Sequence, residues 1–183
     1  MRNLIYTCIA IIFLSSCSSV SKTTYKDAGV YFEITPEFKI GKKTTWKRNH
    51  VTYIPIYLKD EEVYAKFSFV WLPTKSDLDW ELRNYTDALK SVYKPEELGD
   101  LMFSEIKSTN FGAHTARQID YRKASDGPRV GSYIAFHCDS STVVIGYHTT
   151  VEGMAAINRC RDLMEKTYYC IQNESSKTKL IIE

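Results

Sequence analysis

The sequence lacks the short motifs that mark several large enzyme classes. It contains no G-x-S-x-G motif of a nucleophilic serine, no P-loop and no G-x-G-x-x-G turn for a dinucleotide. It also has no internal repeat and no shift in composition that would divide the chain into two domains. These absences argue against the enzymes that such motifs identify, and they indicate a single domain.

An excess of charge of one sign is also missing. The chain carries 24 lysines and arginines against 22 aspartates and glutamates, a formal net charge of +2. A nucleic-acid-binding protein would show a clustered basic stripe, so we expect no nucleic-acid partner. A loose basic group around Gly41 is interpreted as a solvated loop, with contact to an anionic surface as the alternative. Its members are Lys39, Lys42, Lys43, Lys47 and Arg48.

The apolar run at the N-terminus is too short to cross a membrane as a helix. Residues 4–14 are mostly apolar and carry no charge, whereas a membrane-spanning helix needs roughly 20 residues. Arg2 precedes this run, and the small residues Ser15 and Ser16 follow it. A positive residue, a short apolar core and then small residues are typical of a secretory signal peptide.

The end of this segment, Leu14-Ser15-Ser16-Cys17, resembles the lipobox of bacterial lipoproteins. The resemblance implies that residues 1–16 are removed, and that Cys17 becomes the new N-terminus and carries the lipid that anchors the protein to a membrane. In that family, an aspartate after the cysteine retains the protein at the inner membrane. Ser18 at this position implies the periplasmic face of the outer membrane in a two-membrane cell. The alternative is an ordinary secreted protein in which Cys17 has no such role.

The mature chain is predicted to have three parts. After Cys17, residues 18–26 are polar and without periodicity, which predicts a flexible tether. Residues 27–172 are predicted to form the folded domain, which is long enough to bury a core. The polar residues 173–183 are predicted to form a C-terminal tail.

Hydrophobic periodicity predicts strands and two helices in the domain. Pro55 cannot donate a ladder hydrogen bond, so we expect its strand at a sheet edge or a bulge. Ser76 and Asp79 predict a capping box at the start of the first helix. The predicted strands are residues 30–34, 51–58, 63–72, 100–108, 114–123, 129–138 and 142–149, and the predicted helices are residues 77–93 and 151–166.

The last hairpin is apolar on both of its faces. Ile134 and Phe136 lie on one face, whereas Tyr133 and Ala135 lie on the other. A strand that is apolar on both faces must be covered on both. Together with the order of strands, helix, strands and helix, this predicts an α+β fold: a three-layer α/β/α sandwich with a central antiparallel sheet.

This layout resembles the PsbP-like domains, a family known from an extrinsic subunit of photosystem II and from bacterial lipoproteins. The resembling residues are the opening Tyr31-Phe32-Glu33-Ile34-Thr35-Pro36 and the closing hairpin with the C-terminal helix, so the resemblance covers residues 30–170. The resemblance implies a binding or assembly module, since such domains mostly act in this way, and no catalytic signature accompanies it.

Histidines close to Cys138 raise the question of a metal site. In the predicted hairpin register, His137 lies opposite Val144 and His148 lies opposite Tyr133. The two histidines share a face but are four residue steps apart, near 13 Å at about 3.3 Å per step. Cys138 points to the other face. Because a single metal ion holds its ligand atoms about 2 Å away, we predict no metal site here.

Three cysteines remain in the predicted domain. Disulfides form and persist in an oxidising envelope, and because three is an odd number, at most one internal bridge can form. The last helix must return along the sheet and bring its end level with the hairpin turn, beside Cys138, which shares the core face with Phe136. Cys170 lies just past that helix end. We therefore predict a Cys138–Cys170 disulfide, with Cys160 as a small buried apolar residue; a Cys138–Cys160 bridge is the alternative.

Taken with the anchor, these features predict a non-catalytic binding or assembly module of the cell envelope, with an envelope protein as partner and no cofactor. The alternative is an envelope hydrolase with a dispersed active site. The surface distinguishes the two, because a module exposes an apolar or aromatic patch, whereas an enzyme has a cleft with converging polar groups.

Overall fold

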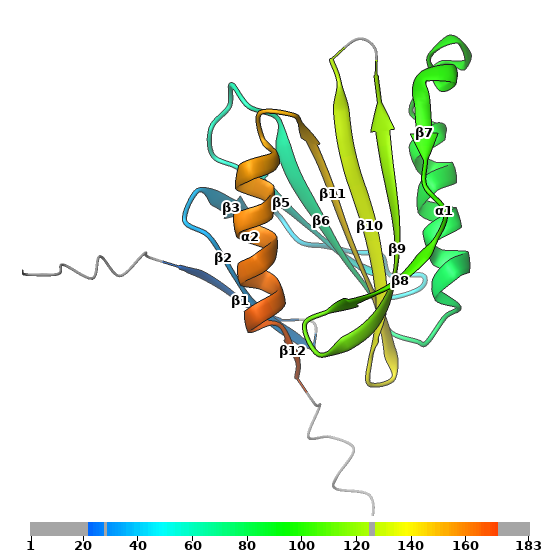
Figure 1. Cartoon of the computed structure of the whole chain (residues 1–183). Coiled ribbons are helices and arrows are strands. Elements are labelled where there is room, and N and C mark those ends of the chain that lie inside the picture. The colour runs from blue at the N-terminus through cyan, green and yellow to red at the C-terminus, as the bar shows by residue number, and fades with distance from the viewer. Residues whose placement is uncertain (1–21, 28, 125–126, 172–183) are drawn as a thin grey trace, which may run out of the picture.

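A computed structural model describes residues 22–27, 29–124 and 127–171, and a large antiparallel sheet dominates it (Figure 1). Within these residues, no helix combines the length and the apolar character that a membrane span needs. The predicted signal peptide, Cys17 and the predicted tail of residues 173–183 lie outside the described residues.

The large sheet has the strand order β3-β5-β6-β11-β10-β9-β7, and β4 and β8 add to β5 and β9. Every pairing in it is antiparallel. Its strands are β3 (Phe38–Ile40), β4 (Thr44–Thr45), β5 (Thr52–Leu58), β6 (Ala65–Leu72), β7 (Leu101–Phe103), β8 (Lys107–Phe111), β9 (His114–Lys123), β10 (Arg129–Cys138) and β11 (Ser141–Thr150).

The strand predicted over residues 100–108 is wrong in its extent. The chain instead forms a short 3-10 helix, η1 (Pro95–Asp100), followed by β7 and β8, which both pair with β9. Ser104 separates the two short strands and binds the main chain of β9: its N–H donates to the Asp120 carbonyl, and its Oγ accepts from the Asp120 N–H. These two hydrogen bonds of Ser104 thus take the place of regular ladder pairing with β9 between the two short strands.

A smaller sheet contains β1 (Thr23–Asp27), β2 (Val30–Ile34) and β12 (Tyr169–Cys170) in the order β1-β2-β12. β1 contradicts the prediction that residues 18–26 are all tether. Tyr25 is buried in this strand, and its ring stacks on Phe32 with centroids 4.9 Å apart. A single apolar residue is a weak periodic signal, so only the partner strand reveals why this polar segment is ordered.

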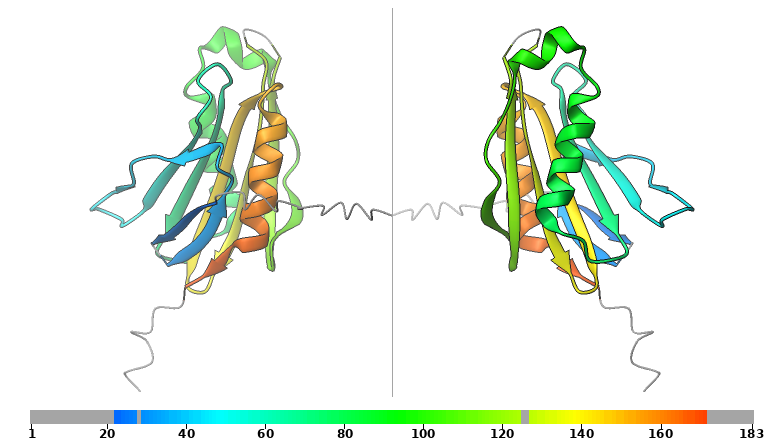
Figure 2. Two further views of the ribbon diagram at one scale, coloured as in Figure 1. Left: turned by 90° about the vertical axis from the view of Figure 1, so that its left-hand side faces the viewer. Right: turned by 90° about the vertical axis from the view of Figure 1, so that its right-hand side faces the viewer.

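The two faces of the large sheet carry separate cores. One core contains Val70, Leu82 and Tyr133 under α1 (Leu78–Lys90), and the other contains Phe32, Phe67 and Ile157 under α2 (Met154–Thr167) and the small sheet. Figure 2 shows α1 on one side, and α2 with the small sheet on the other. The α+β fold with a central antiparallel sheet is therefore present, but one outer layer combines a helix with three strands.

The start of α1 differs from the predicted capping box. Asp77 is the N-cap, and its Oδ1 accepts a hydrogen bond of 2.7 Å from the Trp80 N–H. Ser76 donates both its N–H and its hydroxyl to Thr142 Oγ1. Asp79 instead forms a bidentate pair with Arg117, with contacts of 2.6 and 3.1 Å. Tertiary partners thus take both of the predicted capping side chains, and the helix ends at Lys90 rather than at residue 93.

Pro55 lies in an inner strand and not at an edge, but its position satisfies the same constraint. β3 pairs with Ile56–Leu58 and β4 pairs with Thr52–Tyr53, so Pro55 falls in the gap between the two partners. Its carbonyl accepts a hydrogen bond of 2.7 Å from Gly41. The missing N–H therefore faces an interruption of the ladder, where no partner is lost.

Candidate functional site

A pocket of about 400 Å³ opens near β7, β9, β10 and β11. Asp120 and Tyr147 supply polar atoms to it, and Met102 and Val130 supply apolar surface. The residues that line it are Met102, Phe103, Ser104, Asp120, Tyr121, Arg122, Val130, Gly131 and Tyr147. An apolar pocket with a few polar groups is the usual form of a small-molecule site.

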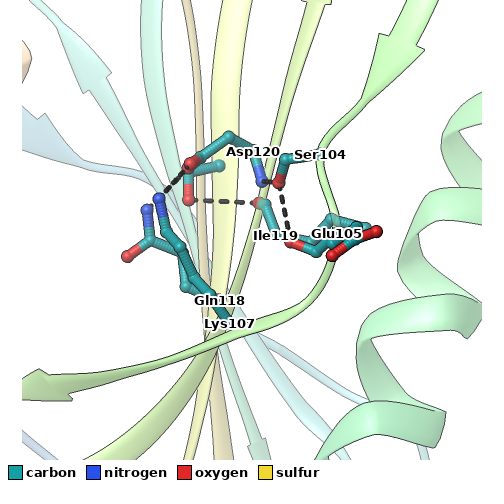
Figure 3. A network of polar contacts seen from close by, with 7 residues as sticks. Ser104, Glu105, Lys107, Gln118, Ile119 and Asp120 are labelled. Atoms are coloured by element: carbon teal, nitrogen blue, oxygen red, sulfur yellow. Dashed lines mark hydrogen bonds and ion pairs between the residues drawn. The ribbon is translucent and has the colours of Figure 1, made fainter.

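Asp120 is the centre of a polar network at this pocket (Figure 3). Lys107 Nζ donates to Asp120 Oδ2 at 2.7 Å, and Gln118 Nε2 donates to Oδ1 at 2.6 Å. Ser104 binds the Asp120 main chain from the other side, at 2.9 and 3.0 Å. The carboxylate is therefore fixed in place by side chains from β8 and β9.

The same network sets the charge of Asp120. Burial alone would raise the pKa of this carboxyl, but hydrogen bonds from Lys107, Gln118 and Ser132, together with the Lys107 charge, outweigh burial and lower the pKa. Across the pocket, burial raises the pKa of Tyr147. At neutral pH, the pocket thus presents an ionised carboxylate and a neutral phenol. General acid or base catalysis needs a pKa near the operating pH, and neither of these groups has one.

The opposite face of the sheet holds a second polar cluster, around His148. The hydroxyl of Tyr121 contacts Nδ1 of this histidine, and the hydroxyl of Tyr133 lies 3.3 Å from Nε2. Burial, aided by the charges of Lys66 and Arg129, lowers the pKa of His148 to about 4. The imidazole is therefore neutral at pH 7, and both of its nitrogens are engaged by phenol groups, so this cluster is built for packing rather than for proton transfer.

The two histidines considered for a metal site lie apart. The hairpin turns at Asp139 and Ser140, with Asp139 in the left-handed region at φ 52°, so the predicted register is wrong by two residues. His137 lies opposite Thr142, and its Nε2 is 2.9 Å from the Ser76 carbonyl oxygen. Across the described part of the chain, no group of three or more His, Cys, Asp or Glu residues could hold a metal ion.

The predicted disulfide is present in the structure. Cys138 and Cys170 are bonded, with their Cα atoms 5.7 Å apart, and the bond joins β10 of the large sheet to β12 of the small sheet. Cys160 is a free, buried thiol whose pKa burial raises to about 11. It is thus the inert apolar residue expected from its helix face. Cys17, the predicted lipid acceptor, lies outside the described residues.

The pocket was not predicted from the sequence. Gln118, Asp120 and Arg122 alternate along β9 on the face where Ala116 joins the apolar core. Polar residues that continue the core-facing side of a strand are a departure from ordinary patterning, and such departures concentrate at functional sites. That alternation is the signal that would have identified the pocket wall.

The sequence matches no family model and no curated protein. Among solved structures, the chain is similar to the solution structure of cyanobacterial PsbP (CyanoP) from Synechocystis sp. PCC 6803. The TM-score is 0.57 and the identity 12%, covering 86% of this chain and 98% of that chain. LpqN, which is involved in cell envelope biogenesis of Mycobacterium tuberculosis, matches with a TM-score of 0.48 and 11% identity, covering 83% of this chain and 91% of that chain. The likeness to CyanoP concerns the fold, and it supports the PsbP-like layout predicted from the sequence.

Proposed function

We propose that this protein is a lipid-anchored component of a bacterial cell envelope whose domain acts as a non-catalytic binding or assembly module. The observation that carries the proposal is the pocket beside Asp120, where an ionised carboxylate is fixed at the edge of apolar surface. A charged group held rigidly beside apolar side chains orients a ligand without reacting with it.

A pocket with converging polar groups is the form expected of an enzyme rather than of a module, but the chemistry of this pocket favours binding over catalysis. Asp120 is already hydrogen-bonded to Lys107 and Gln118, and its pKa is lowered. A hydrolase would need a base that can accept a proton near neutral pH. The ligand that suits this pocket bears a hydrogen-bond donor or a positive charge for Asp120, and an apolar part for Met102 and Val130.

The anchor is proposed from the lipobox-like sequence. Thr23, the first residue of β1, follows Cys17 by only six positions. Six residues extend at most about 20 Å, so a lipid on Cys17 would hold the domain against the bilayer surface. Ser18, next to the cysteine, is the basis for proposing the periplasmic face of the outer membrane.

Capture of partners from solubilised envelope tests the proposed function. Asp120→Asn removes the pocket charge and Val130→Phe fills part of the pocket, so both variants should lose the ligand or partner that the wild type retains. Matched controls are Asp87→Asn on α1 and Val92→Phe, whose side chain is 77% exposed. These controls should bind like the wild type.

Two outcomes would contradict this function. Equal capture by the wild type and both pocket variants would show that the pocket is not the binding site. Turnover of an ester, amide or glycan by the wild type, abolished in Asp120→Asn, would instead support the alternative of an envelope hydrolase with a dispersed active site.

A further inference from the structure

The segment from Phe38 to Leu58 has no acidic residue, although it contains four lysines and one arginine. The cations lie around β4, in a hairpin that we call the basic hairpin and define as residues 39–50. All residues from 42 to 50 are exposed. Figure 2 shows that this hairpin projects from the body on the side that carries α1. The charge is thus concentrated on one protruding element.

The basic hairpin has a defined tip. The Trp46 N–H donates to the Val51 carbonyl at 3.0 Å, and the His50 N–H donates to the Trp46 carbonyl at 2.8 Å. His50 adopts the left-handed conformation, with φ 55°, which closes this turn tightly. Lys47 and Arg48 are therefore held together at the tip, next to Trp46, whose side chain is 49% exposed.

Most of the charge on the basic hairpin is uncompensated. Among the ion pairs between described residues, only Lys43 of the five cations takes part, and its partner is Asp27 at the end of β1. This pair also ties the base of the hairpin to the strand that follows the proposed anchor. Lys39, Lys42, Lys47 and Arg48 remain directed to solvent.

The distance to the anchor allows both elements to meet one surface. β1 runs from Thr23 to Asp27, a length of about 13 Å at about 3.3 Å per residue. The six residue steps from Cys17 to Thr23 reach up to about 20 Å. The tether is thus longer than β1, and the far end of β1 is Asp27, the ion-pair partner of Lys43.

We propose that the basic hairpin docks on a membrane surface by binding the headgroups of anionic phospholipids, with Lys47 and Arg48 supplying charge and Trp46 entering the interface. This inference rests on the proposed function for the membrane location. Tryptophan favours the headgroup region, and each lysine or arginine near an anionic leaflet adds to the attraction. A second contact beside a flexible lipid anchor fixes the orientation of the domain and hence the direction in which its pocket faces.

Vesicle binding by an unacylated chain tests the contact directly. The chain from residue 17 with Cys17→Ser keeps every described residue, and its binding is compared on vesicles of phosphatidylcholine alone and of equal parts phosphatidylcholine and phosphatidylglycerol. We expect binding only to the anionic vesicles. Lys47→Glu with Arg48→Glu should lower the partition coefficient at least about 25-fold, at about fivefold for each cation lost.

A matched control separates the hairpin from overall charge. Lys94→Glu with Lys166→Glu makes the same change in net charge at two exposed residues elsewhere on the domain, and it should bind nearly as well as the parent chain. Trp46 should report entry into the interface by a blue shift of emission, which Trp46→Phe removes while Trp71 and Trp80 remain.

The result that overturns the proposal is equal binding by the parent chain and the Lys47→Glu, Arg48→Glu variant, or equal loss in the control. Absence of binding to either vesicle also overturns it. Because the tested chain carries no lipid, these outcomes are independent of whether Cys17 is acylated in cells. The vesicle experiment thus tests the hairpin contact alone, and the proposed anchor is tested separately by acylation of Cys17.

Discussion

Lys107 lies opposite Gln118 in the β8–β9 ladder, yet its Nζ reaches two positions further and contacts Asp120 Oδ2 at 2.7 Å. This diagonal pair fixes the carboxylate at the pocket. Because the side chains of Lys107 and Asp120 are 54% and 36% exposed, solvent screens the pair and it contributes modestly to stability.

Asp120→Asn should lower the free energy of unfolding by about 1 kcal/mol at pH 7. The folded-state pKa of Asp120 is lowered, so its stabilisation is complete above the unfolded pKa and is lost as pH falls through the folded value. Urea unfolding at pH 7 and pH 3 measures this, and the deficit should shrink at pH 3. The deficit should also exceed that of Asp87→Asn, which removes an exposed pair with Lys90; equal effects would show that the network has no special role.

His148 makes stability depend on pH in a different window. Its pKa is lowered from about 6.5 to about 4, so between these values the unfolded chain binds a proton that the folded chain does not. Stability should therefore fall as pH drops from 6.5 to 4, by up to about 3 kcal/mol from this residue. His148→Gln should be less stable at pH 7 but should lose less on acidification. Parallel pH profiles for the wild type and His148→Gln would contradict this assignment.

Gly131 provides a test of packing on the face of the sheet that carries His148 and Tyr121. A Cβ atom at this position would overlap the ring of Tyr121 and the carbonyl oxygen of Tyr147. Gly131→Ala should therefore destabilise the protein by about 1–3 kcal/mol, because overpacking forces neighbours out of position. Gly99→Ala is the control, since its Cβ would meet nothing within 4 Å. Thermal unfolding compares the two, and a neutral Gly131→Ala would disprove the close approach of Tyr121.

The Cys138–Cys170 bond spans 32 positions in the sequence. Its removal in the double serine variant should cost about 3–4 kcal/mol by the chain-entropy model. Peptide mapping without reductant should recover these two cysteines linked, and Cys160 should resist alkylation until the protein unfolds because it is fully buried. Recovery of Cys160 in the bridge would refute the pairing.

Acylation of Cys17 is testable in cells. Cys17→Ser should leave the precursor uncleaved at that site and abolish labelling by an alkyne fatty acid. The wild type should resist extraction by high salt and dissolve only in detergent, because more than one acyl chain anchors a protein stably. Unchanged labelling of Cys17→Ser would place the lipid elsewhere, and recovery of the protein only in the inner membrane would reject the outer-membrane location.

The sequence predicted those parts of the fold whose signal is local. Apolar residues occupy every second position from 63 to 71, so β6 and its core face, including Phe67 and Phe69, were predicted correctly. The disulfide followed from the lengths of a strand and a helix. The hairpin register depended on which residue of the turn adopts a left-handed conformation, and the sequence leaves several candidates there.

The parts that were missed depend on contacts between distant segments. Tyr25 is ordered because Phe32 supplies the partner ring, and Asp79 is drawn from a capping role by Arg117, 38 positions away. The pocket depends on the same kind of contact, since Lys107 and Asp120 belong to different strands. Periodicity along one segment carries no information about such partners.

The place of β1 at the edge of the small sheet has a mechanical consequence. In the small sheet β1 pairs with β2 and has no strand on its other side among the described residues, whereas β2 also pairs with β12, which the Cys138–Cys170 bond fixes to the large sheet. A pull on the N-terminus would therefore load the β1–β2 ladder and the Asp27–Lys43 pair before it loads the Cys138–Cys170 bond. Detachment of the five residues of β1 would lengthen the N-terminal segment by about 17 Å and would withdraw one core residue, Tyr25. In a chain anchored at Cys17, as proposed, the edge strand would thus add length to the tether under tension.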